Sequence, residues 1–171
     1  LSGENPVTYM ESCQGQTVAL TVLVTGGTGS GQTFTWTGDT NPLYFIDLGD
    51  LVSYKKTTPS GTYNLTVDVT DDGGFSGSAS VTVVIKPSPL ATAVANGSTT
   101  FCSGGSVELE ETNGQTDVTY QWQKGFANIT GATDYIYNAS VGGDYRVKVT
   151  GTNGCYTYST PLITVTVNSL P

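Results

Sequence analysis

Apolar and polar side chains alternate along most of this chain. In the first half, Tyr63, Leu65 and Val67 alternate with Asn64 and Thr66. Successive side chains of a strand point to opposite faces, so a period of two predicts half-buried antiparallel strands. Further apolar sets with this spacing are Val18, Leu20, Val22 and Val24; Val81, Val83 and Ile85; Val107 and Leu109; Tyr120 and Trp122; Tyr145, Val147 and Val149; and Ile163, Val165 and Val167.

Turn-forming clusters separate these segments. They are TGGTGSG at 25–31, TDDGG at 70–74, TNGQ at 112–115 and VGGD at 141–144. Short strands divided at such intervals are typical of β-sandwiches, and no window shows a convincing helical period. The sequence therefore predicts an all-β fold built from antiparallel sandwiches.

The chain repeats its pattern once. SCQGQTVAL at 12–20 and FCSGGSVEL at 101–109 share the order Cys-x-Gly-x-Thr/Ser-Val-x-Leu. Between the copies lies KPSPL at 86–90, whose two prolines cannot continue a central strand and stiffen a short linker. One repeat at this lag predicts tandem domains, 1–86 and 87–171, joined by a Pro-containing linker.

Each half also carries a Trp-bearing strand and a later Gly-x-Tyr segment. We expect Trp36 and Trp122 to be central core aromatics of the two sandwiches. We expect Tyr63 and Tyr145 to occupy tyrosine corners, where the hydroxyl donates to a neighbouring loop backbone. These four residues are the predicted structural core.

Composition narrows the possible functions. Charged residues make up 12% of the chain and the net charge is −8, which argues against a nucleic-acid groove or an anionic membrane surface. The chain has no histidine, which removes Ser-His-Asp and Cys-His catalysis and leaves zinc few good ligands. No apolar run approaches the roughly 18 residues of a membrane span. The chain begins at Leu1 without a start methionine, which indicates a fragment of a longer polypeptide.

The motifs resemble two known families. Residues 12–86, with TFTWTGD, SGTYNLTVDVTDDGG and a closing Thr/Val strand, resemble a PKD (polycystic kidney disease) domain. Residues 91–168, with YQWQKGFANITGATDYIYNASVGGDYRVKVT and NGCYTYSTPLITVTV, resemble the Ig-like repeats of large secreted surface proteins of Bacteroidetes. The resemblance implies a noncatalytic module of an adhesin, gliding-motility protein or exported enzyme, often exported by type IX secretion. Neither family has a fixed ligand.

The Ig-like resemblance also concerns the cysteines. In that family a Cys before the second strand and an Asn-Gly-Cys after the Tyr strand tend to occur together, which implies a disulfide between Cys102 and Cys155. These positions lie toward opposite ends of a standard Ig sandwich, so either the first strand is arranged differently or the pair is not bridged. Cys13 then has no partner in its own domain. It is expected to be a buried free thiol, with pairing to a neighbouring module or chain, or a reactive thiol, as alternatives.

Two further groups have the chemistry of binding sites. Loop carboxylates offer oxygen ligands for Ca²⁺ without any EF-hand spacing, so we expect them to be solvated. Aromatics on an exposed face would stack on sugars, although core or loop packing is the expected role. The carboxylates are Asp39, Asp47, Asp50, Asp68, Asp71 and Asp72; the aromatics are Tyr44, Phe45, Tyr54, Phe126, Tyr135, Tyr137, Tyr156 and Tyr158.

The sequence therefore predicts a noncatalytic structural or adhesive module pair, a spacer or stalk of a secreted cell-surface protein in adhesion or gliding motility. The alternative is a carbohydrate-binding accessory region of an exported polysaccharide-degrading enzyme. We expect no catalytic residue, cofactor or metal site. The expected partners are neighbouring domains of the same polypeptide, with surface glycans or proteins left open, and neither nucleic acid nor an inserted membrane. The expected location is extracellular or at the cell surface.

Overall fold

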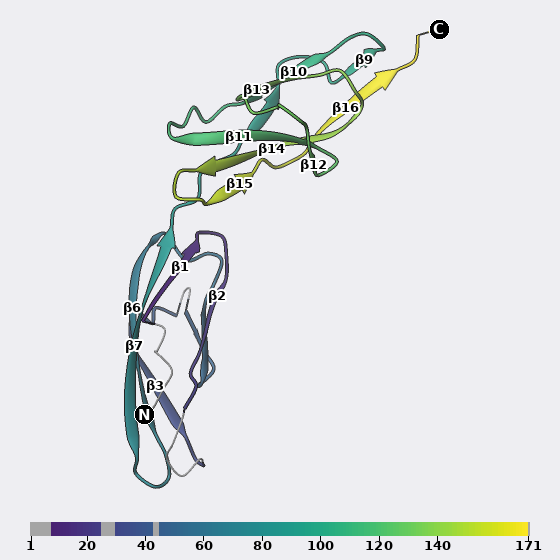
Figure 1. Ribbon diagram of the computed structural model, residues 1–171. Helices are drawn as coiled ribbons and strands as arrows, with labels where there is room; N and C mark the ends of the chain where they lie inside the picture. Colours follow the sequence, from purple (N-terminus) through teal and green to yellow (C-terminus); the bar gives the residue numbers. More distant parts are fainter. Residues whose placement is uncertain (1–7, 25–29, 43–44, 171) are drawn as a thin grey trace. The chain divides into compact units, whose positions relative to one another are not determined.

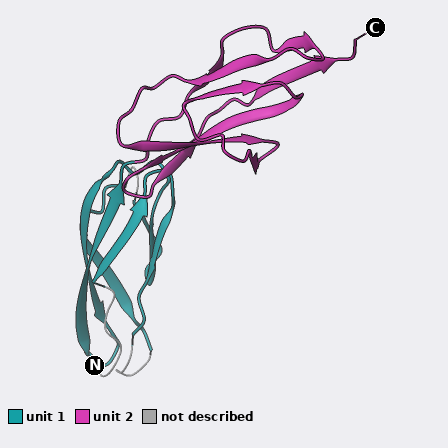
Figure 2. Ribbon diagram, turned by 45° about the horizontal axis from the view of Figure 1, so that its top comes forward, with its two compact units in different colours: residues 1–87 teal, residues 88–171 magenta. Residues whose placement is uncertain are grey.

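The computed structural model describes residues 8–24, 30–42 and 45–170 (Figure 1). The described residues form strands, turns and irregular segments without any helix, so the all-β prediction is confirmed. Contacts between Cα atoms divide the chain into two compact units, Leu1–Pro87 and Ser88–Pro171 (Figure 2). Most of the predicted turn at 25–31 lies outside the described residues.

Unit 1 contains two sheets. One has the strand order β1-β7-β6-β3 and the other the order β2-β5-β4. All neighbours pair antiparallel except β1 and β7, which are parallel. The strands are β1 (Tyr9–Cys13), β2 (Val18–Thr21), β3 (Thr33–Gly38), β4 (Phe45–Asp47), β5 (Leu51–Tyr54), β6 (Gly61–Thr70) and β7 (Ser76–Lys86).

The core of unit 1 lies between its two sheets. In β6 the alternation buries Tyr63, Leu65 and Val67, while Asn64 and Asp68 are exposed. Because both sheets contribute to one cluster, the unit is a β-sandwich. The buried cluster consists of Val18, Phe45, Val52 and Tyr54 from one sheet and Tyr63, Leu65, Val83 and Ile85 from the other.

Unit 2 has the same architecture. One sheet has the order β13-β10-β8; the other has the order β12-β11-β14-β16-β9, with β15 also paired to β14. The last two strands, β16 and β9, are parallel. The strands are β8 (Ala93–Ala95), β9 (Thr100–Cys102), β10 (Val107–Glu111), β11 (Val118–Lys124), β12 (Ala127–Asn128), β13 (Ile136–Ala139), β14 (Gly143–Gly151), β15 (Tyr156–Tyr158) and β16 (Ile163–Asn168).

Trp122 is at the centre of the unit 2 core. It has no exposed surface, its side chain pairs across the sheet with Val147, and its Nε1 donates to Asp134 O at 3.0 Å. The equivalent Trp36 pairs with Val67 but is only half-buried, and its Nε1 donates to Gly49 O at 2.8 Å. The buried cluster of unit 2 consists of Val107, Leu109, Trp122, Ala132, Ala139, Tyr145, Val147, Val149 and Val165.

The two Gly-x-Tyr segments form the same local structure. The Tyr63 hydroxyl donates to Pro59 O at 2.8 Å, and the Tyr145 hydroxyl donates to Val141 O at 2.6 Å. Both bonds reach four residues back along the chain, which is the geometry of a tyrosine corner. Each ring fills the core while its hydroxyl holds the loop that precedes the longest alternating strand.

The repeated Cys-x-Gly motif forms the same turn in both units. Cys13 and Cys102 end the strands that run parallel to the last strand of each unit. Cys13 O accepts from Gln16 N at 3.1 Å, and Cys102 O accepts from Gly105 N at 3.0 Å. The third residue of each turn is a glycine with positive φ, 92° at Gly15 and 94° at Gly104, and a β-turn with positive φ at this position favours glycine.

The predicted Cys102–Cys155 disulfide is wrong. Cys102 is a free, exposed cysteine, whereas Cys13 and Cys155 are disulfide-bonded. The expectation of a free Cys13 is therefore also wrong. Sheet register explains why the predicted pair cannot form. Cys102 ends β9 and Cys155 directly precedes β15, and these two strands lie at opposite ends of unit 2 (Figure 1).

The separation follows from three pairings. Cys102 of β9 pairs with Asn168 of β16. Asn168 is five residues along β16 from Ile163, and Ile163 pairs with Tyr145 of β14. Six residues further along β14 is Gly151, whose N donates to Cys155 O at 2.9 Å. Eleven residues at about 3.3 Å each place the two cysteines roughly 35 Å apart. A disulfide needs Cα atoms within about 7 Å.

Candidate functional site

The outer face of the β11–β14–β15 region gathers cations, aromatic rings and an amide. Tyr145, Val147 and Val149 of β14 point into the core, so Arg146 and Lys148 point outward. Paired residues on neighbouring strands lie on the same face. The register sets Gln123 opposite Arg146, Tyr158 opposite Lys148 and Tyr156 opposite Thr150. We call Gln123, Phe126, Arg146, Lys148, Tyr156 and Tyr158 the cation–aromatic face.

Arg146 is the most constrained member of this face. Its Cζ lies 3.8 Å from the centre of the Tyr158 ring and 4.5 Å from the centre of the Phe126 ring. Its Nε donates to Gln123 Oε1 at 2.8 Å. Gln123 is buried and its Nε2 donates to Asn128 Oδ1 at 2.7 Å. Two rings and a buried amide therefore orient the guanidinium, which cation–π attraction further stabilises.

Lys148 forms a second cation–aromatic pair beside the first. Its Nζ lies 4.0 Å from the centre of the Tyr156 ring. The Tyr156 and Tyr158 rings meet edge to face, with centroids 5.5 Å apart and an interplanar angle of 75°. Tyr156 is 47% exposed and Phe126 is 64% exposed, so aromatic surface remains accessible to a ligand.

The turn that carries Phe126 is strained. Gly125 and Phe126 connect β11 to β12 as a two-residue hairpin loop, with φ values of 52° and 68°. Positive φ at both positions defines a type I′ turn, which favours Asn-Gly or Gly at these positions. A bulky side chain in this region is an outlier, and such outliers cluster at binding sites. This turn carries the Phe126 ring that lies against Arg146.

Among the described residues, no carboxylate forms a salt bridge with the cations of this face. The salt bridge that the described residues contain is Lys86–Glu11 in unit 1, at 2.8 Å. Asp144 shares the outward side of β14 with Arg146, and its Oδ1 accepts a hydrogen bond from Thr164 Oγ1 at 2.7 Å. Arg146 is the single arginine of a chain whose net charge is −8.

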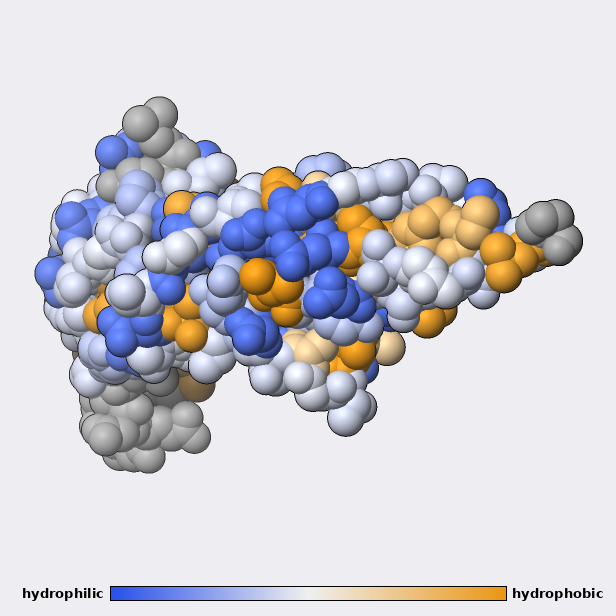
Figure 3. Space-filling view, turned by 90° about the horizontal axis from the view of Figure 1, so that it is seen from above, coloured by the Kyte–Doolittle hydropathy of each residue, from blue (hydrophilic) through white to orange (hydrophobic). Residues whose placement is uncertain are grey.

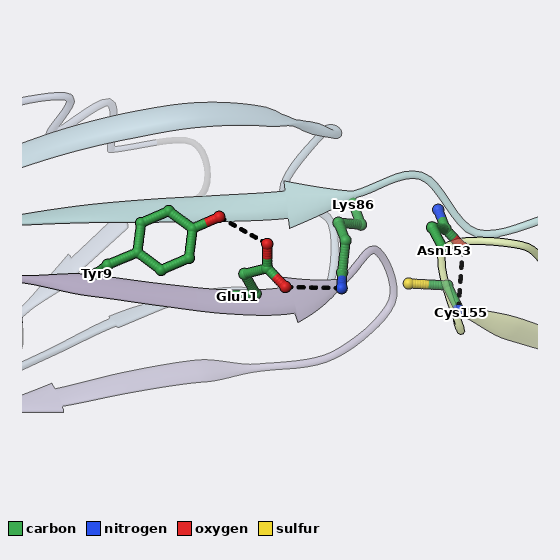
Figure 4. A network of polar contacts seen from close by, with 5 residues as sticks. All are labelled: Tyr9, Glu11, Lys86, Asn153 and Cys155. Carbon is green, nitrogen blue, oxygen red and sulfur yellow. Dashed lines mark hydrogen bonds and ion pairs between the residues drawn. The ribbon is translucent and has the colours of Figure 1, made fainter.

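A polar network in unit 1 links the parallel strands β1 and β7. Glu11 accepts from the Tyr9 hydroxyl at 2.6 Å and from Lys86 Nζ at 2.8 Å (Figure 4). The pKa of Glu11 is lowered mainly by the hydrogen bond from Lys86 and next by the hydrogen bond from Tyr9. The pKa of Tyr9 is raised mainly by its hydrogen bond to Glu11. In unit 2, Cys155 N donates to Asn153 Oδ1 at 3.0 Å (Figure 4).

The Tyr145 side chain lies in the core of unit 2. Its burial, and secondarily the charge of Tyr137, raise the pKa of Tyr145.

Two buried or half-buried side chains of unit 2 hold the segment that follows the linker. Gln115 accepts from Leu90 N at 3.0 Å and donates to Leu90 O at 2.8 Å. Glu111 Oε1 accepts from Thr92 N at 3.3 Å and from Asn113. Glu111 is 2% exposed, and its Oε2 has no hydrogen-bond partner among the described residues. The start of unit 2 is thereby attached to the unit's own sheet.

The loop carboxylates considered as candidate Ca²⁺ ligands, and expected to be solvated, are dispersed over unit 1. Asp39 Oδ2 accepts from Asn64 N at 2.7 Å, Asp47 Oδ1 from Gly49 N, and Asp71 Oδ1 from Gly73 N and Phe75 N, each at 2.9 Å. These carboxylates act as local backbone acceptors. In the part of the chain that the structure describes, no three His, Cys, Asp or Glu side chains are grouped so that they could hold a metal ion.

The candidate aromatics separate into two classes. Tyr54 is buried against the Phe45 and Tyr63 rings, and Tyr137 is half-buried against Trp122 and Tyr145. Tyr135, Tyr156 and Phe126 are exposed, and Tyr44 lies outside the described residues. The alternation of Tyr145, Val147 and Val149 in the sequence implies that Lys148 points outward, but it does not reveal the cluster around Arg146. The available signal was the outward alternation in RVK at 146–148 together with YTY at 156–158.

Several large apolar side chains are also exposed, among them Leu23, Phe75 and Leu90. On the face shown in Figure 3, apolar residues occur in separate small groups among hydrophilic ones. Scattered apolar residues of this sort are normal on protein surfaces. The described segments contain no helix with the length and apolarity needed to span a bilayer.

Three solved structures resemble this chain at low sequence identity and with TM-scores below 0.5. No family model matches the chain, and no curated protein matches it. A structure of Dpr2 Ig1-Ig2 in complex with DIP-Theta Ig1-Ig3 is 15% identical over 95% of this chain and 94% of that one, with a TM-score of 0.47. Murine CEACAM1b is 13% identical over 94% and 96%, with a TM-score of 0.40. The Bacteroides ovatus mixed-linkage glucan utilization locus SGBP-B, in complex with a mixed-linkage heptasaccharide, is 21% identical over 94% and 43%, with a TM-score of 0.37.

Proposed function

We propose that the chain is a noncatalytic pair of β-sandwich modules that acts as a spacer in a long secreted cell-surface protein. The observation that carries this proposal is that each unit closes a hydrophobic core of its own, from its own two sheets. A module with its own core needs no partner domain to bury its apolar residues. Such modules can be joined in series, and each one adds to the length of a stalk.

The connection between the units supports a structural role. Pro87, Ser88 and Pro89 separate Lys86, the last residue of β7, from Leu90. Gln115 holds Leu90 at both backbone groups. Proline-rich connections act as semi-rigid spacers, and side-chain anchoring shortens the connection further. The proposed role is to project a distal binding element away from its attachment point.

Sequence features support the extracellular context. The disulfide-bonded state of Cys13 and Cys155 is typical of oxidising compartments. The PKD-like and Ig-like resemblance of residues 12–86 and 91–168 favours a surface protein of the kind found in Bacteroidetes, in adhesion or gliding motility. We propose that the two sandwiches are tandem domains of these kinds.

A replacement experiment tests the spacer role. In the polypeptide that carries this chain, residues 8–170 are exchanged for an unrelated tandem of two β-sandwiches, or are deleted. Accessibility of the distal segment to an antibody on intact cells is the readout. We expect the exchange to preserve accessibility and the deletion to reduce it. Unchanged accessibility after deletion, or its loss after the exchange, contradicts a spacer.

The second candidate function is a carbohydrate-binding accessory region of an exported enzyme. The specific observation that favours it is the cation–aromatic face, where exposed rings and an oriented guanidinium lie on one open sheet surface. Aromatic rings offer flat apolar surfaces for sugars, and the neighbouring polar groups offer hydrogen bonds. Binding of glycans by the whole chain tests this candidate.

A further inference from the structure

We propose that the cation–aromatic face binds carboxylate-bearing polysaccharides, with Arg146 as the residue that recognises the carboxylate. The inference rests on the second candidate function and names its ligand class. It follows from the hydrogen-bond donors of Arg146 that no group among the described residues uses, from the second cation, Lys148, and from the exposed Phe126 and Tyr156 rings against the two cations.

The contacts of Arg146 leave its terminal nitrogens for a ligand. Nε is used by Gln123, and the guanidinium plane lies against the Tyr158 and Phe126 rings. Within the described residues, no carboxylate forms a salt bridge with either Nη. The remaining N–H groups lie at the edge of the guanidinium, in the fork that matches the two oxygens of a carboxylate. Stacking fixes this fork before a ligand arrives, which lowers the entropic cost of binding.

With Lys148 as a second cation, the face contains two cation–ring pairs in a row along β14. Arg146 and Lys148 are two residues apart on one side of β14, which separates their backbone positions by about 6–7 Å. Each has its own ring, Tyr158 for Arg146 and Tyr156 for Lys148. A polysaccharide with a carboxylate on each sugar presents anions and apolar ring faces in alternation. This alternation matches the order of cations and aromatic rings on the face.

Charge complementarity is local. The chain as a whole carries a net charge of −8, so its overall field repels polyanions. An anion that binds here is therefore held by short-range contacts rather than by long-range attraction. Asp144, the acidic residue nearest along β14, is engaged with Thr164.

The rings favour sugars over acidic peptides. Phe126 and Tyr156 expose aromatic surface on an open sheet, and pyranose rings stack on such surfaces through their C–H groups. The turn at Gly125–Phe126 adopts positive φ with a bulky residue, which keeps one of these rings beside the guanidinium. An acidic peptide would use the cations but would leave the rings without a matched partner.

The test uses the full chain in affinity gel electrophoresis with polygalacturonate. The comparison polymers are its carboxyl-reduced neutral form, a sulfated polysaccharide and poly-glutamate. Two variants are matched, Arg146→Lys and Lys56→Gln. Arg146→Lys keeps the positive charge but loses the paired N–H donors of the guanidinium. Lys56→Gln removes one positive charge from an exposed turn of unit 1. Near-UV circular dichroism and thermal unfolding check that both variants are folded.

We expect wild type and Lys56→Gln to be retarded by polygalacturonate alone. We expect Arg146→Lys to bind polygalacturonate at least about tenfold more weakly, the lower end of the range for losing a hydrogen bond to a charged group. Equal weakening by both variants, or equal retardation by sulfated polymer or poly-glutamate, overturns the inference. Retardation by the neutral polymer overturns the carboxylate assignment but keeps glycan binding. No retardation by any polysaccharide removes the second candidate function as well, and leaves the spacer proposal standing.

Discussion

At the scale of single residues, one torsion angle explains why Cys-x-Gly occurs twice. Gly15 and Gly104 both have φ above 90° in a turn that leaves the strand ending in cysteine. No atom lies within 4 Å of the position that a Cβ would occupy at either glycine. The requirement for glycine is therefore conformational rather than steric. The cysteine of the motif has no such shared role, since Cys13 is disulfide-bonded and Cys102 is not.

Substitution of Gly104 tests this requirement. Gly104→Ala should lower the free energy of unfolding by about 1–2 kcal/mol, because an L-residue is strained at positive φ. Urea unfolding measures the change. Gly97→Ala is the matched control: Gly97 lies in the same unit, and its added Cβ would meet Val107 Cγ2 at an ordinary 3.8 Å. Equal destabilisation by both variants would contradict a conformational role.

The cysteine assignment has a direct chemical test. Under denaturing conditions without reductant, a thiol reagent should modify Cys102 and neither Cys13 nor Cys155. After reduction all three should react. Peptide mapping by mass spectrometry identifies the modified residue. Labelling at Cys13 without reduction would restore the arrangement expected from the sequence and refute the one described.

At the scale of elements, hairpins and edge strands determine which side chains lie together on the outer face of each sheet. The β11–β12 hairpin holds Phe126 in a strained turn, and the β14–β15 hairpin sets Tyr156 and Tyr158 beside the cations of β14. In unit 1, the edge strand β1 is tied to β7 by Glu11 and Lys86. These contacts join residues 75 positions apart in the chain.

The strain at Phe126 predicts a difference between two substitutions. Phe126→Val and Phe126→Asn both remove the ring that lies over Arg146. Asn tolerates positive φ, whereas a β-branched residue does not. Phe126→Val should therefore be about 1–2 kcal/mol less stable than Phe126→Asn. Urea midpoints of the two variants measure this, and equal midpoints would show that the turn relaxes freely.

The Glu11 network predicts a dependence on pH. The pKa of Glu11 is lowered from its ordinary value of 4.5, so its contribution to stability is present above that value and is lost as the pH falls through the lowered pKa. The gap in thermal midpoint between wild type and Glu11→Gln should therefore shrink between pH 7 and pH 3. Glu11→Gln combined with Lys86→Gln serves as the control, because the double variant lacks both partners. A gap independent of pH would exclude the interaction.

At the scale of the whole molecule, two separate cores organise the chain. The buried clusters centred on Tyr54 and Trp122 share no residue, and each draws on both sheets of its own unit. Stability is then distributed over two cooperative units rather than one. For a spacer, this allows one module to open without loss of structure in the other.

Truncation of a core tryptophan tests this division. Trp122→Ala should cost unit 2 about 3–5 kcal/mol, because it removes a fully buried indole. Hydrogen exchange followed by mass spectrometry should show faster exchange in β14 and unchanged exchange in β6. Trp36→Ala should do the reverse, with a smaller effect because Trp36 is only half-buried. Loss of protection in both units from either variant would indicate a single cooperative core.

Much of the architecture could be predicted from local pattern. The period of two in segments such as 145–149 predicted strands and their inward faces, because burial alternates with each residue whatever the strand pairs with. The repeated motifs and the prolines of 86–90 led to the expectation of two sandwiches. The same alternation implies that Lys148, between Val147 and Val149, points outward. All these features depend on residues that are close together in the chain.

The remaining features depend on register between distant strands, which local pattern does not contain. Pairing of β9 with the far end of β16 separates Cys102 from Cys155 by about eleven residues of strand, so a disulfide expected from motif order does not form. Pairing of β14 with β11 and β15 brings Arg146 to Gln123 and Lys148 to Tyr158. The sequence by itself determined the fold class and the core-facing residues, because these follow from alternation. Only the tertiary structure decided which cysteine is free and which side chains form the cation–aromatic face, because a shift of register would change every cross-strand neighbour.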